Sequence, residues 1–280
     1  MFQYAFAYSV SRDNNTELRL DIDGFDSYDL RDYELRLYGI NDNTDFEFKY
    51  KSSLGRLQAK NENFVDRIAR TLLIKLLGFS KSFHHEKKES AFDEDVFNVE
   101  VDTYFYGYWQ NEKYFKKYRK DLLEIFILKN IHAKTIEYQQ QIIKREAVSL
   151  HIRRGDYVTD AHTNSVHGTC DVKYYKKAVM EVLKSKKQAH FFIFSDDLDW
   201  AENNLDFIVN KTFIRLESDV PDHEEMYLMS QCKHNIIANS SFSWWGAWLN
   251  KNSQKIVIAP KKWFNNSKSN QIVPHDWIKI

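Results

Sequence analysis

The second half of this 280-residue chain predicts an α/β fold built on a parallel sheet. From residue 147 onward, short apolar runs alternate with amphipathic stretches, a rhythm typical of strands joined by helical crossovers. The first half lacks this rhythm, so we place a domain boundary near residue 145 and expect domains at 1–145 and 146–280. The chain is 43% hydrophobic, which is enough for a substantial core.

In the second half the pattern predicts each element in turn. Residues 147–152 form an apolar run that reads as a buried strand, and a loop separates it from the next helix. We expect strands over 147–152, 190–194, 211–216, 235–238 and 255–259, and helices over 172–183, 198–205, 222–231 and 242–249.

The first half gives weaker signals. Helical spacing predicts a helix interior at 1–9, a helix over 64–77 and a long amphipathic helix over 112–129. Alternation predicts a strand over 18–22, and the aromatic stretch 104–110 reads as a strand or turn. The charge-dense stretch 81–95 reads as a loop.

Composition excludes several classes of protein. Forty basic and forty acidic residues give no net charge, which argues against a general nucleic-acid or polyanion binder. Two cysteines do not make a disulfide scaffold, so we expect a reducing, cytoplasmic compartment. No apolar run is long enough to span a membrane. The basic run 116–120 is either a solvated helix face or a contact with anionic lipid.

Two adjacent arginines end the strand at 147–152. Arg153 and Arg154 follow it directly, and Asp156 comes two residues later. The carboxyl ends of strands are where open α/β sheets bind ligands, and paired guanidiniums suit a diphosphate. A surface salt bridge between arginine and aspartate is the alternative interpretation.

Polar residues follow two further strands. Ser195, Asp196 and Asp197 follow the strand at 190–194, and Asn239, Ser240 and Ser241 follow the strand at 235–238. Both groups could be ordinary helix caps. Because parallel strands end at one edge of a sheet, the three loops together favour a nucleotide pocket.

Acidic triplets offer a metal-dependent alternative. Residues 21–23 and 93–95 both fit an acidic pattern that holds a divalent ion on a diphosphate, but neither lies in the half that carries the arginines. Arg153 and Arg154 could neutralise a leaving diphosphate instead.

Several motifs together resemble glycosyltransferase family 11, the bacterial α-1,2-fucosyltransferases. The similarity runs in the right order along nearly the whole chain, and its two long motifs are specific. The matching segments are 151–157 (HIRRGDY), 234–249 (HNIIANSSFSWWGAWL), 20–25 (LDIDGF), 107–110 (GYWQ) and 194–197 (FSDD).

The resemblance implies a GT-B fold, in which two Rossmann-like domains face each other across a cleft and the second holds the nucleotide sugar. It implies inverting transfer of L-fucose from GDP-β-L-fucose, a co-substrate, to the 2-hydroxyl of a galactoside, with no metal or other cofactor. By analogy the acceptor belongs to surface polysaccharide biosynthesis and could be lipid-linked. A peripheral contact with the inner face of the cell membrane is left open.

The resemblance also assigns site residues. Arg153 would contact the β-phosphate, and Asp156 is the candidate base, with Asp160 as the alternative. His151 is grouped with the donor site and expected to pack beneath the loop. The remaining donor contacts would be Arg154, Ser195, Asp196, Asp197, Asn239, Ser240 and Ser241.

One departure concerns the start of the chain. Members of the family usually have a strand and a glycine-rich loop before the Met-Phe-Gln-Tyr-Ala sequence, which here is residues 1–5. We therefore expect that the first strand of the N-terminal domain is missing and that the chain is truncated. The alternative functions are an inactive relative that binds GDP-sugar or glycan without transfer, and a generic phosphate-binding α/β protein.

Overall fold

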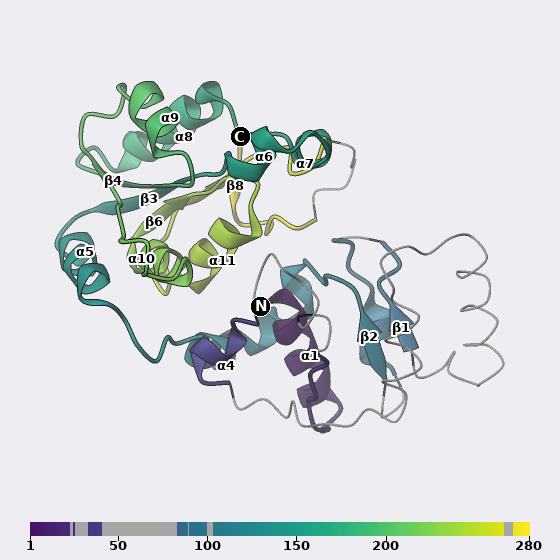
Figure 1. Ribbon diagram of the computed structural model, residues 1–280. Coiled ribbons are helices and arrows are strands. Elements are labelled where there is room, and N and C mark those ends of the chain that lie inside the picture. The colour runs from purple at the N-terminus through teal and green to yellow at the C-terminus, as the bar shows by residue number, and fades with distance from the viewer. Residues whose placement is uncertain (23–24, 26–32, 41–82, 89, 100–102, 266–270) are drawn as a thin grey trace. The chain divides into compact units, whose positions relative to one another are not determined.

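A computed structural model of the chain describes residues 1–22, 25, 33–40, 83–88, 90–99, 103–265 and 271–280 (Figure 1). The chain divides into two compact units, Met1–Lys129 and Asn130–Ile280, called here the N-terminal and C-terminal units. The boundary thus precedes the expected position near residue 145. The reason is helix α5 (Ala133–Ile143), which packs on α10 (His223–Gln231) of the C-terminal unit.

The C-terminal unit is built on a six-stranded parallel sheet with the strand order β5-β4-β3-β6-β7-β8. The chain starts in the middle, adds two strands on one side and then returns to add three on the other. This is the strand order of doubly wound nucleotide-binding folds, and the predicted α/β class is confirmed. The strands are β3 (Ala147–Ile152), β4 (His190–Ser195), β5 (Lys211–Phe213), β6 (His234–Ile236), β7 (Val257–Ala259) and β8 (Ile278–Lys279).

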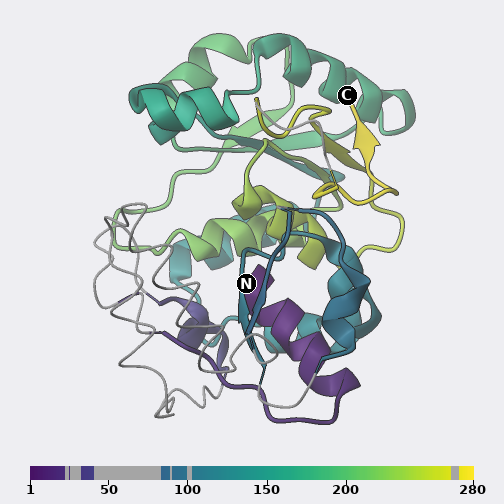
Figure 2. The same ribbon diagram turned by 90° about the vertical axis from the view of Figure 1, so that its right-hand side faces the viewer.

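Apolar residues on both faces make β3 and β4 central strands. Every residue of β3 is buried. Val148 and Leu150 pack in the cluster that contains residues of α8 and α9, whereas Ala147 and Phe192 pack in the cluster with residues of α10 and α5. Figures 1 and 2 show the helices in two layers, with the sheet between them. A parallel sheet covered on both faces requires such continuous apolar strands.

Three helices of this unit, α7, α8 and α9, begin at an aspartate cap. Asp171 accepts the Tyr174 N–H at the start of α8, and Asp160 accepts the Thr163 N–H at the start of α7. Two helices, α6 and α7, occupy the stretch that was expected to be a loop. The bounds are α6 (Gly155–Thr159), α7 (Ala161–His167), α8 (Val172–Ser185), α9 (Leu198–Asn204) and α11 (Ser241–Leu249).

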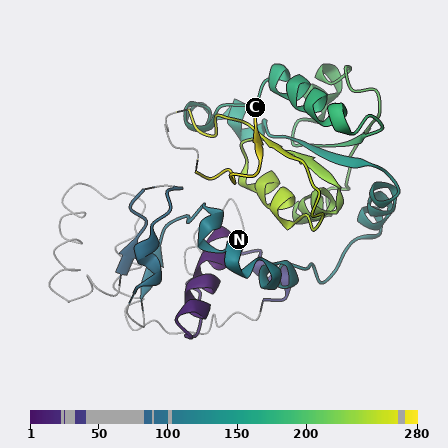
Figure 3. The same ribbon diagram turned by 180° about the vertical axis from the view of Figure 1, so that it is seen from behind.

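The edge strand β8 was not predicted. It lies at the end of the sheet beside β7, near the C-terminus (Figure 3). Its two residues are exposed, so no apolar run marks it in the sequence. Backbone hydrogen bonds alone define it, as in the contact from Lys261 N to Ile280 O at 2.8 Å.

The described part of the N-terminal unit centres on helix α1 and a pair of parallel strands. Phe6 of α1 stacks on Trp109 with ring centroids 4.1 Å apart. The helix at 1–9 and the strand within 104–110 are confirmed, as α1 (Phe2–Asp13) and β2 (Tyr104–Tyr106), and β2 pairs with β1 (Phe83–His85). Two short 3-10 helices also lie in this unit: η2 (Leu35–Tyr38) and η3 (Glu94–Phe97).

Three predictions in this unit are wrong. Residues 18–22 form no strand, and β1 lies inside the expected loop 81–95. The long helix over 112–129 is instead three short pieces: η4 (Glu112–Tyr114), η5 (Lys116–Tyr118) and α4 (Arg119–Ile125). Phe115 interrupts it with φ −134° and ψ 0° and is fully buried, so packing overrides the helical pattern. The predicted helix 64–77 lies outside the described residues.

Candidate functional site

The three polar loops lie at one edge of the C-terminal sheet, as the parallel pairing requires. The loop with Arg153 follows β3, and the loop with Asp196 follows its neighbour β4. The loop with Ser240 follows β6, on the other side of β3. The chain changes direction between β3 and β6, and open α/β sheets bind ligands at such a point.

Arg153 is held by two carboxylates. Its Nη2 lies 2.6 Å from Asp156 Oδ1, and its Nη1 lies 3.0 Å from Asp196 Oδ2. The guanidinium also lies over the ring of Tyr157, 5.5 Å from its centroid. A quarter of the Arg153 side chain stays exposed, so an anion can reach it.

Arg154 ties the first loop to the second. Its Nε lies 2.9 Å from Asp197 Oδ2, and its backbone N–H donates to Asp196 Oδ1 at 2.8 Å. The guanidinium stacks over Trp200, 4.4 Å from the ring centroid. This arginine is anchored on three sides, which suits a residue that shapes the loop.

Asp197 has both carboxylate oxygens engaged. Oδ2 contacts Arg154, and Oδ1 accepts the Trp200 N–H as the cap of α9. Ser195 Oγ accepts the N–H of Asp197 at 3.0 Å. These two residues were predicted to contact the donor, but in this structure their polar atoms hold the loop that presents Asp196.

Gly155 is needed where the two loops meet. A Cβ at this position would lie 2.8 Å from Asp196 Oδ2, closer than real side chains approach. Any larger residue would push Asp196 away from Arg153 and from the Arg154 N–H. The glycine of the motif therefore protects the contact between the loops.

Asn239 was predicted as a donor contact, and the structure corrects this. Its side chain is buried, and its Nδ2 donates to the carbonyls of His167, Gly168 and Trp263 at 2.9, 3.2 and 3.2 Å. The Asn239 carbonyl accepts the hydroxyl of Tyr157 at 3.3 Å. Asn239 thus joins the end of α7 to the segment after β7 and leaves no amide hydrogen for a ligand.

Ser240 and Ser241 lie at the start of α11. Ser240 occupies the cap position, and its side chain makes no capping hydrogen bond. Ser241 is the first residue of the helix and is exposed. A helix N-terminus beside two arginines adds partial positive charge that favours a phosphate group.

His151 lies under the arginine loop and not on its surface. It is 4% exposed, and no hydrogen-bond partner of its Nδ1 is found among the described residues. Burial, with Arg153 adding repulsion, lowers the pKa of His151 to about 3. The ring is therefore neutral at physiological pH, and its buried position beneath the loop is the expected one.

The two candidate bases differ in their surroundings. Half of the Asp156 side chain is exposed, and the carboxylate contacts Arg153. Asp160 instead caps α7, and hydrogen bonds from Thr163 lower the pKa of its carboxyl. Asp160 is thus engaged as a helix cap, whereas Asp156 lies beside Arg153 with half of its side chain exposed, so the geometry favours Asp156.

Sequence reasoning missed Glu225 on α10. Burial raises the pKa of its carboxyl to about 7, and the charges of Asp222 and Asp196 add to the effect. Carboxyls with such shifts cluster at functional sites. The acidic stretch 222–225 was a visible signal, but it was interpreted only as the start of a helix.

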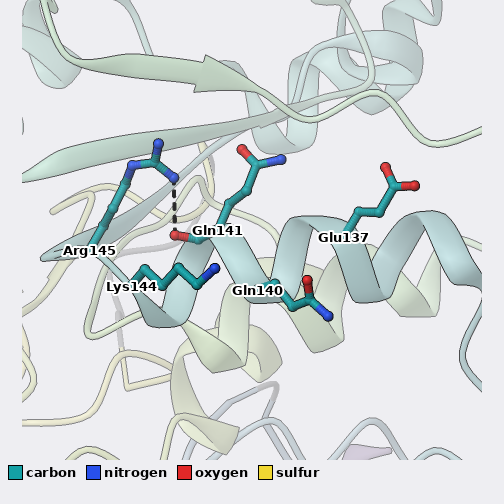
Figure 4. A pocket seen from close by; sticks show the side chains of 5 residues that line it. All are labelled: Glu137, Gln140, Gln141, Lys144 and Arg145. Carbon is teal, nitrogen blue, oxygen red and sulfur yellow. Dashed lines mark hydrogen bonds between the residues drawn. The ribbon is translucent and has the colours of Figure 1, made fainter.

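The acidic triplet at 93–95 has protein partners. Lys87 Nζ lies 3.0 Å from Asp93 and 3.3 Å from Asp95, and Asp93 caps a 3-10 helix. The triplet at 21–23 extends outside the described residues. A surface hollow on α5 contains none of the predicted site residues and is lined by Glu137, Gln140, Gln141, Lys144 and Arg145 (Figure 4).

The cluster is suited to exchange of anions. Two guanidiniums meet the three carboxylates of Asp156, Asp196 and Asp197, a formal excess of one negative charge. An incoming phosphate would compete with these carboxylates for the guanidiniums. Asp156 is the most exposed of the three, so it is the partner that Arg153 can most easily release.

Comparisons with known proteins agree with the motifs. The family model for glycosyl transferase family 11 matches residues 70–280. The chain is 34% identical to an α-1,2-colitosyltransferase of Escherichia coli over 283 residues, covering 100% of this chain and 94% of that protein. It is 31% identical to the O-antigen biosynthesis glycosyltransferase WbnK of Escherichia coli over 295 residues, covering 100% and 96%.

Two more distant matches are a human protein and a solved structure. The human galactoside α-(1,2)-fucosyltransferase 1 is 26% identical over 107 residues, which is 38% of this chain and 29% of that protein. A crystal structure of the NodZ α-1,6-fucosyltransferase soaked with GDP-fucose aligns with 89% of this chain and 87% of that chain. Its TM-score is 0.45 and its sequence identity 14%.

Proposed function

The chain belongs to glycosyltransferase family 11, and we propose that it transfers L-fucose from GDP-β-L-fucose to the 2-hydroxyl of a galactose-containing glycan. It is a glycosyltransferase related to α-1,2-fucosyl- and α-1,2-colitosyltransferases. The observation that carries the proposal is the pair Arg153 and Arg154, which form ion pairs with the neighbouring loop at the point where the strand order reverses. Two guanidiniums at that point can donate paired hydrogen bonds to the diphosphate of a nucleotide sugar.

Arg153 stabilises the departing GDP in this mechanism. When the bond from sugar C1 to the phosphate oxygen breaks, the electron pair leaves with GDP, and charge grows on the β-phosphate. A guanidinium already held in place by Asp196 meets that charge without reorganising. Ser240 and Ser241 present the start of α11 to the phosphates.

Asp156 receives the proton of the acceptor hydroxyl. A phosphate bound to Arg153 displaces this carboxylate, because one guanidinium edge cannot serve both. The released carboxylate then accepts the proton while the 2-hydroxyl oxygen forms its bond to C1 on the face opposite GDP. Donor binding and base activation are thereby linked, and inversion follows from the single displacement.

Colitose is a second candidate for the sugar. A relative 34% identical over the whole chain carries the name α-1,2-colitosyltransferase. Colitose is fucose without its 3-hydroxyl, so comparing the two donors tests whether the sugar pocket binds that hydroxyl. We expect faster transfer from GDP-fucose than from GDP-colitose, and the opposite order would assign colitose.

The proposal is tested by transfer with the purified chain. GDP-fucose, lactose and other galactosides serve as substrates, and the products are identified by mass spectrometry and linkage analysis. We expect Arg153→Ala to reduce kcat about 100- to 1,000-fold, the loss typical of a removed oxyanion contact, with the melting temperature little changed. A variant with most of its activity would overturn the site assignment.

The inactive alternative predicts a different outcome. A binding protein without transferase activity would bind GDP or glycan but would neither transfer sugar nor hydrolyse GDP-fucose.

The relative WbnK is named for O-antigen biosynthesis, which supports an acceptor from a surface polysaccharide. We propose a cytoplasmic site of action, with a lipid-linked acceptor and a peripheral contact with the inner face of the membrane.

A further inference from the structure

The turn at 106–109 in the N-terminal unit is held rigidly from several sides. One carboxylate oxygen of Glu86 accepts the N–H groups of Tyr108 and Trp109 at 2.7 and 3.3 Å, and its other oxygen accepts the Ser90 N–H. Gln3 Nε2 donates to the carbonyl of Gly107 at 3.0 Å. These contacts come from segments far apart in the sequence, so tertiary structure specifies the turn.

The turn also carries backbone strain. Trp109 has φ +56°, a left-handed conformation that non-glycine residues rarely adopt. Its ring is 1% exposed and stacks on Phe6, which locks the strained residue in place. A Cβ on Gly107 would lie 2.5 Å from Glu86 Cβ, so only glycine fits there. Strain that is fixed in this way clusters at ligand clamps and active sites.

The tip of this rigid turn displays aromatic rings to solvent. Tyr108 is 63% exposed and Tyr106 is 45% exposed. In the ranges that the structure describes, Phe25 is the one other aromatic side chain that is exposed. Core packing does not explain why an aromatic ring stands at position 108, because the ring is exposed while the backbone of the turn is fixed by hydrogen bonds.

We infer that Tyr108, with Tyr106 two residues before it, is a stacking platform for the galactose ring of the acceptor. The apolar C–H face of galactose packs on the negative face of an aromatic ring. The inference rests on the proposed function, because the acceptor class comes from there. It assigns the GYWQ segment, which the donor chemistry leaves without a role.

Other occupants fit this surface less well. Two rings cover far less than the roughly 800 Å² per partner of a stable protein interface. A membrane-binding surface would need a basic, amphipathic face, whereas the turn is fastened to a glutamate and nearby Lys87 is paired with Asp93 and Asp95. A single sugar ring matches the size of the exposed Tyr108 ring, while Tyr106 packs beside His85.

The test compares variants of the purified chain with lactose as acceptor. We expect Tyr108→Ala to raise the acceptor KM about tenfold, the loss of one aromatic contact, with kcat, donor KM and donor hydrolysis within about twofold of wild type. Tyr108→Leu keeps apolar bulk but lacks the ring, so it should behave like alanine, while Tyr108→Phe should keep the wild-type KM. Ile127→Ala, at an exposed apolar residue of the same unit, is the control and should leave the acceptor KM unchanged.

A donor-free measurement separates this inference from the proposed function. Saturation-transfer NMR with methyl β-galactoside reports sugar binding even if no donor is ever consumed, so its loss in Tyr108→Ala supports the platform whatever the reaction is. Unchanged galactoside binding and unchanged KM in that variant would overturn it. So would a Tyr108→Ala protein that binds galactoside normally but no longer sediments with phosphatidylglycerol vesicles, since the surface would then contact lipid.

Discussion

His151 should make the C-terminal unit sensitive to acid. The residue is buried in β3 below Arg153, where a second positive charge is costly. Its pKa is about 3 in the folded protein and about 6.5 in an unfolded chain. The unfolded state therefore takes up a proton first, and the stability due to a neutral His151 is complete above pH 6.5 and lost as the pH falls toward 3.

The size of the effect follows from the two pKa values. Each pH unit within the window costs about 1.4 kcal/mol, so unfolding becomes easier by about 2 kcal/mol between pH 7.5 and pH 5 from this residue alone. His151→Gln removes the titration and keeps a polar side chain. We expect the variant to be less stable than wild type at pH 7.5 and the gap between the two to narrow by about 2 kcal/mol at pH 5.

The assay is urea denaturation of both proteins at pH 7.5, 6.0 and 5.0. Tryptophan fluorescence suits it, because six of the seven tryptophans lie in the C-terminal unit and Trp109 is the exception. His162→Gln, at an exposed position of the same unit, is the control for replacing a histidine. If the gap for His151→Gln stayed constant to within about 0.5 kcal/mol, the burial argument would be refuted.

Three other predictions concern the same unit. Asn239→Ala leaves one buried and two partly buried carbonyls without their donor, so it should lower the free energy of unfolding by about 1–3 kcal/mol; a denaturation midpoint equal to wild type would contradict its supporting role. Glu225 has a raised pKa, so the wild type loses stability as the pH rises from 4.5 through 7. Glu225→Gln should therefore be relatively more stable at pH 8 than at pH 5 in paired urea titrations, and a reversed order would contradict the shift. In our proposal arginines, and not a metal ion, neutralise the negative charge on the departing GDP. EDTA at roughly 5–10 mM should therefore leave kcat unchanged, and a loss of activity restored by Mg²⁺ would assign a metal.

The C-terminal unit was largely predictable because local pattern and tertiary environment agree there. The strand over 147–152 coincides with β3, and the helix starts near 172, 198 and 242 lie close to those of α8, α9 and α11. Strands buried on both faces are continuous apolar runs, which sequence displays directly. The edge strand β8 has no such apolar run, so the sequence pattern does not predict it.

The site was predictable in position but less so in roles. Arg153 and Asp196 lie together because their strands are neighbours, a consequence of parallel pairing alone. Asn239 looks equally polar in the sequence, yet its side-chain amide donates to the carbonyls of His167, Gly168 and Trp263, which are far from it in the chain. Hydrogen bonds between such distant segments leave no local signal.

The sequence by itself determined the α/β class of the second half, the three loops that meet at one sheet edge, and the family resemblance, because each depends on residue order and periodicity. Only the tertiary structure decided which polar residues face the ligand edge and which support it. It placed Asn239 between distant segments and Tyr108 at the tip of a strained turn. The physical reason is that burial and hydrogen-bond partners depend on segments that meet only after folding.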